Sequence, residues 1–296
     1  MFSIDKIYEN FEFKPDTKPC AFADSGEVVR FICKDCYADQ LTDDNIDFTQ
    51  MNMTHNNPIT GPLYINDAQP GDVLKVELQN IEIADFASMC VRTGVGTYEV
   101  EGCHCRRFPI ENGIVKFDNN IEIPIKPMVG VMGTSPASGA ASTQSPGEHG
   151  GNMDIRELGV GSIIYFPVNV PGALLSMGDI HAVQGDGETA ICAMEVSGAV
   201  TVKVEVVKGD KFIPTPFIVT PKSYYTTASA KSLDECSVAA ARKMHRFVME
   251  YANMDDGQAA MLLSVVGHLR ISQVVNPEKG CIMELPRAFV DLGDLL

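Results

Sequence analysis

The sequence of this 296-residue chain predicts a mainly β fold: a β-sandwich or jelly-roll-like body with a small α-helical C-terminal part, α+β overall. Two observations support this prediction. The chain contains 25 Gly and 17 Pro, which divide most of residues 1–222 into short strand-like runs separated by turns. Near Ser223 the pattern changes, and apolar residues then recur at helical spacing. We therefore expect a β-rich body over residues 1–222 and a helical part over residues 223–296 that packs on it.

Four segments of the body carry the pattern of β-strands. Residues 73–78 alternate in part between apolar and polar and follow a Gln-Pro-Gly-Asp turn. Residues 200–206 alternate most clearly, with four Val on one face. Residues 121–125 also alternate, and Pro124 predicts an edge strand because proline has no N–H to donate to a sheet. The continuous apolar run at residues 163–168 predicts a strand that is buried on both faces.

Two helices are predicted in the C-terminal part. Ser232 and Glu235 have the spacing of a capping box, in which an N-cap Ser is followed three residues later by Glu. The helix that begins there is expected to run to about Asn253. A second helix is expected from about Asp255 to Gly267.

The charge balance excludes some classes of partner. The chain carries 23 Lys+Arg against 39 Asp+Glu, a formal net charge of −16. A negative field of this size repels nucleic acids and anionic membranes, so we expect neither as a partner. No apolar run reaches the ~18 residues of a membrane helix, and the first residues do not resemble a secretory signal. We therefore expect a cytoplasmic protein whose nine cysteines are reduced thiols.

Residues 130–154 are rich in Gly, Ala, Ser, Thr and Pro and contain few bulky side chains. This composition predicts a long loop with a functional role. The loop ends at residues 148–154, where one His, one Asn and two carboxylates occur together. The adjacent Gly150 and Gly151 would let the backbone approach a ligand closely. A polar surface turn is the alternative, and the spacing leaves both interpretations open.

A second cluster lies at residues 178–188, where polar side chains alternate with small residues. His181 and the carboxylates near it are the ligand types of a borderline-soft divalent metal. Glu195 follows between Met194 and Val196, in a strand-like run over residues 189–196. A carboxylate in an apolar run is costly unless it is paired or ligating. Asp186-Gly187 is also a hairpin signal, so a structural role for His181 stays open.

His55 lies in residues 54–62, where Asn-Pro and Gly-Pro steps predict a rigid, extended turn. It is either a site residue or a turn residue.

The cysteines form one CxxC motif, at Cys33 and Cys36, and one CxC motif, at Cys103 and Cys105. A zinc site of four thiolates would require two such pairs to meet in space. We favour structural roles for these thiols, and we retain Asp35 as a candidate site carboxylate.

Five stretches occur in order along the chain: NPITGP at residues 57–62, AQPGDVL at 68–74, GVMG at 130–133, GGNMD at 150–154 and GDIHAVQGDGE at 178–188. In this combination the sequence resembles the acetamidase/formamidase family. The resemblance covers residues from about 25 to 210, and the C-terminal part is compatible with it. The motifs of Ser-Ser-Lys amidases and Cys-Glu-Lys nitrilases are absent from the sequence.

The resemblance implies an enzyme that hydrolyses a short linear amide, of the formamide or acetamide class, to a carboxylate and ammonia. It also implies a β-sandwich-rich fold and a homodimer or higher homo-oligomer. Residues 1–222 would then form the catalytic body.

The chemistry of this reaction requires an activated water, stabilisation of an oxyanion and a proton for the leaving amine. A divalent metal would activate the water, with zinc as the first candidate and calcium as the second. A carboxylate would transfer the proton, and amide or backbone N–H groups would bind the oxyanion. We predict metal ligands at His181, Asp154, His55 and Asp35, catalytic roles for Glu195, Asp186 and Asn152, and substrate contacts at Gly133, Gly150, Gly151 and Gln184.

Three alternatives remain at this point. The first is a non-catalytic metal- or ligand-binding β-sandwich protein in which the cluster only stabilises the fold. The second is a structural acidic oligomer whose Gly/Ser-rich loop binds a protein partner. The third is a cysteine hydrolase that uses Cys33 or Cys105.

Overall fold

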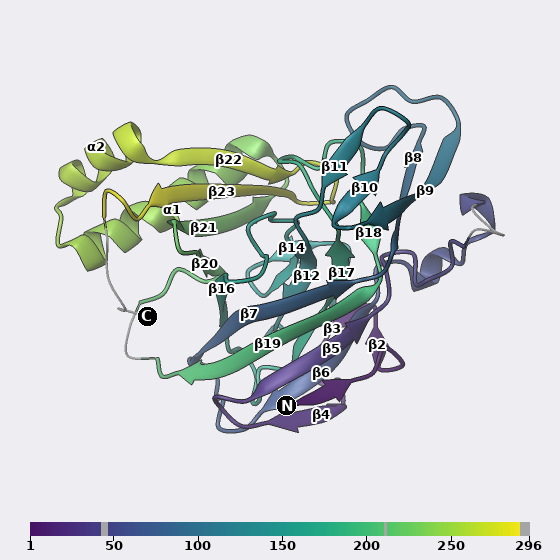
Figure 1. Ribbon diagram of the computed structural model, residues 1–296. Helices are drawn as coiled ribbons and strands as arrows, with labels where there is room; N and C mark the ends of the chain where they lie inside the picture. The colour runs from purple at the N-terminus through teal and green to yellow at the C-terminus, as the bar shows by residue number, and fades with distance from the viewer. Residues whose placement is uncertain (43–46, 210–211, 291–296) are drawn as a thin grey trace.

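The computed structural model describes residues 1–42, 47–209 and 212–290. Two large β-sheets pack face to face, and two α-helices, α1 (Leu233–Ala252) and α2 (Asp256–Val266), lie at one end of the molecule (Figure 1). The predicted fold, mainly β with a small helical part near the C-terminus, is confirmed. Among the described helices, none is both long and apolar enough to cross a membrane.

The first sheet has nine strands. Three of its strands were predicted from alternation or continuous apolarity: β7 (Val73–Ile83), β16 (Ile163–Pro167) and β19 (Gly198–Val207). In spatial order the strands are β1 (Phe2–Ile4), β5 (Val28–Cys33), β19 (Gly198–Val207), β7 (Val73–Ile83), β16 (Ile163–Pro167), β20 (Phe217–Val219), β21 (Ser223–Ala230), β23 (Lys279–Pro286) and β22 (His268–Gln273).

The second sheet has twelve strands, of which nine form one continuous path. Its first strand contains Pro124, so the predicted edge position of this segment is confirmed. The path runs β11 (Glu122–Pro124), β10 (Ile114–Lys116), β9 (Cys103–Glu111), β8 (Phe86–Arg92), β18 (Glu195–Val196), β17 (Leu175–His181), β12 (Met128–Gly133), β15 (Gly150–Asn152) and β14 (Pro146–Gly147). The others are β6 (Ile59–Ile65), which pairs with β17, and β2 (Glu9–Asn10) and β4 (Ala21–Ala23), which pair with β6.

Four short elements complete the body. Strands β3 (Glu12–Phe13) and β13 (Ala141–Ser142) form a separate two-stranded sheet. Two short 3₁₀ helices, Phe48–Gln50 and Met53–His55, lie between β5 and β6.

Two hydrophobic cores share the nine-stranded sheet. The first fills the space between the two sheets and contains the inward-facing Val of β19. The second lies between α1 and the strands β21 and β23, with Phe247 of α1 fully buried. Strand β16 contributes Ile164 to the first core and Tyr165 to the second. The prediction that this strand is buried on both faces is therefore confirmed.

Both predicted helices are present with the expected ends. The Ser232 hydroxyl accepts a hydrogen bond from the N–H of Glu235 at 3.2 Å, and α1 ends at Asn253 in the left-handed conformation. A complete, reciprocal capping box is found at the start of α2, between Asp255 and Gln258. Residues 223–290 also contribute strands β21, β22 and β23 to the nine-stranded sheet, so this part is not purely helical. The division after residue 222 stays a prediction.

The prediction of a long loop over residues 130–154 is wrong. This segment contains β13, β14, β15 and most of β12. Gly133, Gly150 and Gly151 are required by close packing of the backbone; a Cβ at Gly150, for example, would lie 2.3 Å from the carbonyl oxygen of Met132. The strand expected over residues 189–196 is also shorter than predicted, since only β18 at its end is regular.

The prediction that all nine cysteines are reduced is wrong for one pair. Cys90 and Cys105 face each other in the register of β8 and β9 and form a disulfide. The other seven cysteines are free thiols, of which Cys103 is exposed.

Candidate active site

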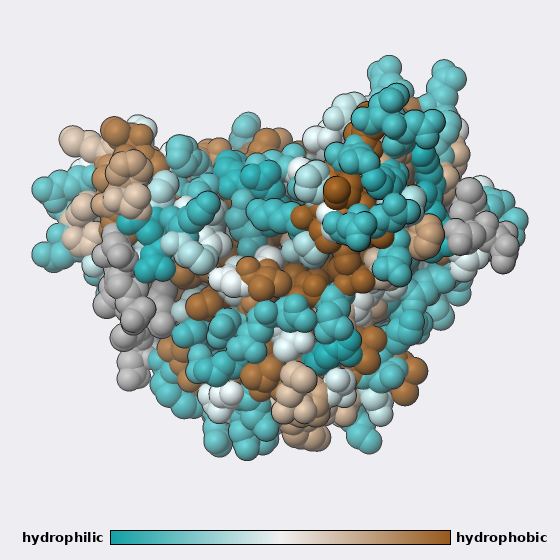
Figure 2. All heavy atoms as spheres, viewed as in Figure 1, coloured by the Kyte–Doolittle hydropathy of each residue, from teal (hydrophilic) through white to brown (hydrophobic). Residues whose placement is uncertain are grey.

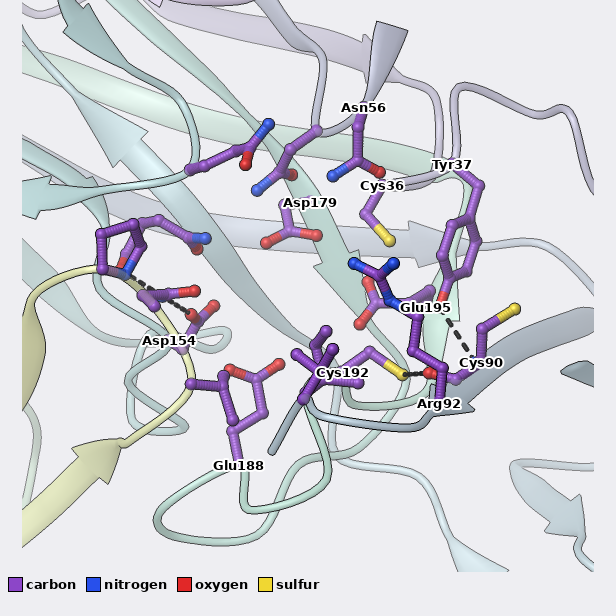
Figure 3. Close-up of a pocket in the computed structure, with 18 of the residues that line it drawn as sticks. Cys36, Tyr37, Asn56, Cys90, Arg92, Asp154, Asp179, Glu188, Cys192 and Glu195 are labelled. Carbon is purple, nitrogen blue, oxygen red and sulfur yellow. Dashed lines mark hydrogen bonds between the residues drawn. The ribbon is translucent and has the colours of Figure 1, made fainter. Parts of the chain in front are cut away.

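A cavity of about 440 Å³ opens over the ends of β17 and β18 (Figure 3). Its lining combines carboxylates and amides with apolar side chains from several loops. The lining residues are Cys36, Tyr37, Met53, Asn56, Asn57, Cys90, Arg92, Val95, Gln144, Asn152, Asp154, Asp179, Glu188, Ile191, Cys192, Glu195, Val275, Asn276, Pro277 and Lys279.

The polar floor of the cavity is built on the pairing of β17 with β18. His181 and Glu195 are direct neighbours in this antiparallel register, so their side chains lie on the same face. Asp179 precedes His181 by two residues in β17 and shares that face. His181 Nε2 lies 3.2 Å from Glu195 Oε2 and 3.4 Å from Asp179 Oδ1.

Asp154 and Glu188 complete a set of four buried carboxylates at the floor. Figure 3 shows the carboxyl groups of Asp154, Asp179, Glu188 and Glu195 turned toward a common space. The Asn276 side chain donates a hydrogen bond to Asp154 Oδ2 at 2.7 Å.

Two further amides fix the orientation of this cluster. Gln184 faces His181 Nδ1 at 2.8 Å and donates a hydrogen bond from Nε2 to the backbone oxygen of Asp154 at 2.7 Å. With its NH₂ group toward Asp154, the Asn152 side chain donates to both carboxylate oxygens at 3.0 and 2.9 Å. The His181 ring and the Asp154 carboxylate are therefore held from behind, as is common for metal-binding residues.

Gly130 of β12 provides the space in which two of the carboxylates meet. A Cβ at this position would lie 2.6 Å from Asp154 Oδ1 and 2.6 Å from Asp179 Oδ2. Only glycine leaves room for both oxygens in this arrangement, which gives the GVMG motif a physical role.

Burial and the neighbouring charges shift the pKa of four groups at the floor, Asp154, Glu188, Glu195 and His181. Burial, followed by the charge of Asp179, raises the pKa of Asp154 to about 7. Burial also raises the pKa of Glu195 to about 7 and that of Glu188 well above its usual value. Burial alone would lower the pKa of His181, but Glu195 and Asp179 raise it well above its ordinary value. Shifts of this kind are concentrated at functional sites.

The donor set fits a divalent cation. In the described part of the chain, one buried oxygen of Glu188 has no hydrogen-bond partner. Asp179 Oδ1 and Glu195 Oε2 have none beyond their ion-pair contacts with His181 Nε2. Buried carboxylates of this kind are costly unless a cation or proton compensates them. Donor atoms lie within 4.8 Å of one another in two groups, one of Asp154, His181 and Glu188 and one of Cys36, Asp179 and Glu195. Nitrogen, thiol and carboxylate donors together favour zinc, whereas oxygen donors alone would favour calcium.

Backbone strain is concentrated at the same place. Five non-glycine residues with positive φ line the cavity, and four of them are Asn, Asp or Glu. The fifth, Ile191, has a φ of 108°, which is rare for a β-branched side chain. Such conformations persist where the surrounding structure enforces them, and they are common at functional sites. The five are Asn57, Asp154, Asp179, Glu188 and Ile191.

Several predicted site residues meet at the cavity. Asp154, Asn152 and Glu195 line it, His181 lies directly beneath, and Gln184 contacts His181 from behind. Their roles in catalysis and binding stay predictions.

Other predicted residues lie elsewhere, which does not support their assigned roles. Asp186 lies outside the cavity and forms ion pairs with Arg270 and Arg156. His55 is exposed and packs against the Phe11 ring at 5.2 Å between ring centroids. Asp35 is buried, where it accepts a hydrogen bond from the Asp39 N–H at 2.7 Å, and burial raises its pKa to about 6.

The predicted substrate-contacting glycines are also absent from the cavity lining. Gly133, Gly150 and Gly151 lie in the pairing of β12 with β15. A Cβ at Gly133 would lie 2.7 Å from the His149 carbonyl oxygen, and one at Gly151 would lie 2.4 Å from the Ser145 carbonyl oxygen. Their small size therefore serves strand packing.

Sequence reasoning missed four residues of the floor: Asp179, Glu188, Cys36 and Asn276. Asp179 could have been found from its i, i+2 spacing to His181 on one strand. Glu188 lay within the recognised motif, and Cys36 lay beside the candidate Asp35. Asn276 has no signal in the sequence, because it reaches the site from the turn between β22 and β23.

The cysteine hydrolase alternative is not supported. Cys33 is buried in the first core, and burial raises the pKa of its thiol to about 12. Cys105 is bonded to Cys90. Neither sulfur is a thiolate that could attack a substrate.

Comparisons with known proteins identify the family of the chain. The model of the acetamidase/formamidase family matches residues 5–139 and 125–292. The crystal structure of an acetamidase from Bacillus halodurans superposes with a TM-score of 0.94 at 36% identity, covering 97% of this chain and 98% of that one. A protein described as a predicted acetamidase/formamidase from Thermoanaerobacter tengcongensis has a TM-score of 0.95 at 35% identity, covering 98% and 97%.

A curated formamidase from Methylophilus methylotrophus is 44% identical over 98 residues, which are 30% of this chain and 24% of that protein. The family match spans most of the chain, and the structural matches span nearly all of it at more than 30% identity. On these grounds the chain belongs to the acetamidase/formamidase family of amidohydrolases.

Proposed function

We propose that this protein hydrolyses a linear primary amide to a carboxylate and ammonia with the help of a bound divalent cation, zinc in the first place. The observation that carries the proposal is the set of four buried carboxylates around His181 at the floor of an open cavity. Family membership supports the reaction class, and the names of its relatives, formamidase and acetamidase, support an amide substrate.

The residues that would hold the cation are His181, Asp154 and Glu188, whose donor atoms lie within 4.8 Å of one another. Asp179 and Cys36 belong to a second such group together with Glu195. When bound, such a cation supplies a Lewis acid that activates water and polarises the amide carbonyl. Asn276, Asn152 and Gln184 keep the ligands in place through the hydrogen bonds described above.

Glu195 is the proposed proton carrier. Its Oε1 accepts a hydrogen bond from the Ala193 N–H at 2.9 Å, while its Oε2 faces His181 Nε2 at 3.2 Å. Its pKa of about 7 is suited to accepting a proton from water and then giving it to the leaving amine at neutral pH. The Asn152 amide, at the cavity wall, would be a donor for the oxyanion only if it turned away from Asp154, so we assign it an orienting role.

The test is ammonia release from formamide and acetamide, together with metal content, for the protein before and after chelation. Chelation should abolish turnover, and one added divalent metal should restore it. His181→Ala should lose both metal and activity, whereas His268→Ala, at an exposed position in β22, should keep both. Full activity and metal content in His181→Ala would overturn the assignment. Turnover that survives chelation would support amide hydrolysis and contradict its dependence on a metal.

We also propose that the protein forms a homo-oligomer. Met261 and Val265 of α2 are 72% and 82% exposed, and Leu269 of the edge strand β22 is 51% exposed. Figure 2 shows apolar residues gathered at the α2 end of the molecule. Clustered exposed apolar side chains are typical of association surfaces. Light scattering after size-exclusion chromatography, on wild type and on Val265→Lys, tests this, and a monomeric wild type would refute it.

A further inference from the structure

The cavity is larger than formamide or acetamide requires. Acetamide has four non-hydrogen atoms. If each takes no more than the ~30 Å³ of a water molecule in the liquid, the whole molecule fills on the order of 120 Å³. The cavity measures about 440 Å³, a size that in other proteins holds ligands of many more atoms. Most of the space is therefore available to a larger group on the substrate.

The wall that faces this space contains a group of apolar side chains. Val95 comes from the loop between β8 and β9, Ile191 from the segment before β18, and Val275 from the turn between β22 and β23. Met53 and Pro277 continue the apolar surface. The first three are partly exposed in this structure, so a ligand that covers them would remove apolar area from water.

This wall is held in a fixed shape. The Thr97 N–H donates to the Thr189 carbonyl oxygen at 2.8 Å, and the Tyr98 and Thr189 hydroxyls lie 2.9 Å apart. A Cβ at Gly96 would lie 2.9 Å from the Ala190 carbonyl carbon, so the two loops are in close backbone contact. The strained φ of 108° at Ile191 shows that the protein keeps this side chain in place at a cost in energy.

We infer that the preferred substrate is a primary amide whose apolar acyl or aryl group is larger than the methyl group of acetamide and packs against Val95, Ile191 and Val275. The inference rests on the proposed amide hydrolysis and specifies its substrate class. In the reaction, the oxygen of water bonds to the acyl carbon and the C–N bond breaks. Of the two protons of water, one goes to the nitrogen, which leaves as ammonia. The other is lost from the carboxylic acid and taken up by the ammonia, so the products at neutral pH are the carboxylate and ammonium.

The experiment measures kcat/KM by ammonia release for formamide, acetamide, butanamide, hexanamide and benzamide with the metal-loaded enzyme. Each added methylene that is buried should raise kcat/KM by about fourfold until the cavity is full. An optimum at acetamide, with lower values for all longer amides, would overturn the inference and leave the proposed amidase intact. Turnover of no amide at all would overturn both.

Two variants test the wall itself. Val95→Phe and Val275→Phe each fill part of the space, and each should lower the hexanamide-to-acetamide ratio of kcat/KM by about tenfold or more. The same substitution at Val238, 47% exposed on α1, should leave the ratio unchanged. If one cavity variant fails to fold, the other carries the test. A ratio that stays at the wild-type value in a folded cavity variant would overturn the inference.

Discussion

Replacing Gly130 by Ala should damage the site while leaving the fold intact. The φ angle of Gly130 is not in the left-handed region, so the backbone itself accepts alanine. The added Cβ would lie 2.6 Å from one oxygen of Asp154 and from one oxygen of Asp179, whereas ordinary contacts begin at 3.4 Å. Each carboxylate must therefore move by about 0.8 Å.

The expected magnitudes follow from this displacement. Overpacking a well-filled interior costs about 1–3 kcal/mol in the free energy of unfolding. A misplacement of about 1 Å in a catalytic group costs on the order of 100-fold in rate. We therefore expect Gly130→Ala to remain folded, to bind the metal more weakly, and to show a kcat/KM for acetamide about 100-fold below that of the wild type.

The assay combines urea unfolding, metal content after dialysis and ammonia release. The matched control is Gly185→Ala, because Gly185 also has an ordinary φ and an added Cβ there meets no atom within 4 Å. The control should retain stability, metal and activity. A Gly130→Ala protein with wild-type metal content and kcat/KM would show that the two carboxylates need not lie together, and the proposed site would be refuted.

Three other predictions concern stability. Burial lowers the pKa of His149 to about 4, so the unfolded chain binds this proton at a higher pH than the folded protein does. The free energy of unfolding of the wild type, relative to that of His149→Gln, should therefore decrease by up to about 3 kcal/mol from pH 7 to pH 4. If urea titrations give the same difference between the two proteins at every pH, this prediction is contradicted. Reducing the Cys90–Cys105 disulfide, which joins residues 15 positions apart, should cost about 3 kcal/mol, and Cys103→Ser should not alter that loss. Ser232→Ala should cost about 1 kcal/mol by removing the N-cap of α1, and an unchanged denaturation midpoint would argue against it.

The parts of the fold that were predictable are those where burial follows a simple period. Residues 200–206 alternate because β19 has one face in the core, and residues 163–168 are apolar throughout because β16 separates two cores. Residues 130–154 were misread because their glycines suggest a loop. In the structure several of these glycines let neighbouring segments approach more closely than a residue with a side chain would permit. The need for glycine can be recognised only when the neighbouring strand is known.

The site was predictable where residue chemistry is unusual for its surroundings. Glu195 between two apolar residues and His181 among carboxylates were recognised on that basis, and both lie at the cavity floor. His55 was chosen for its residue type alone, and it lies on the surface. Asn276 could not have been found, since nothing in a local stretch of sequence indicates contact with Asp154, which is 122 positions away.

This last contact has a consequence for biosynthesis. Asn276 reaches Asp154 from the turn between β22 and β23, so the ribosome must add a further 122 residues after Asp154 before this carboxylate can acquire that partner. Contacts between residues so distant in the chain also form slowly, because a long loop must close first. Until then Asp154 lacks one of the hydrogen-bond donors that orient it. If the proposed cation binds at this cluster, its complete set of oriented ligands is therefore expected to form only after synthesis has passed residue 276.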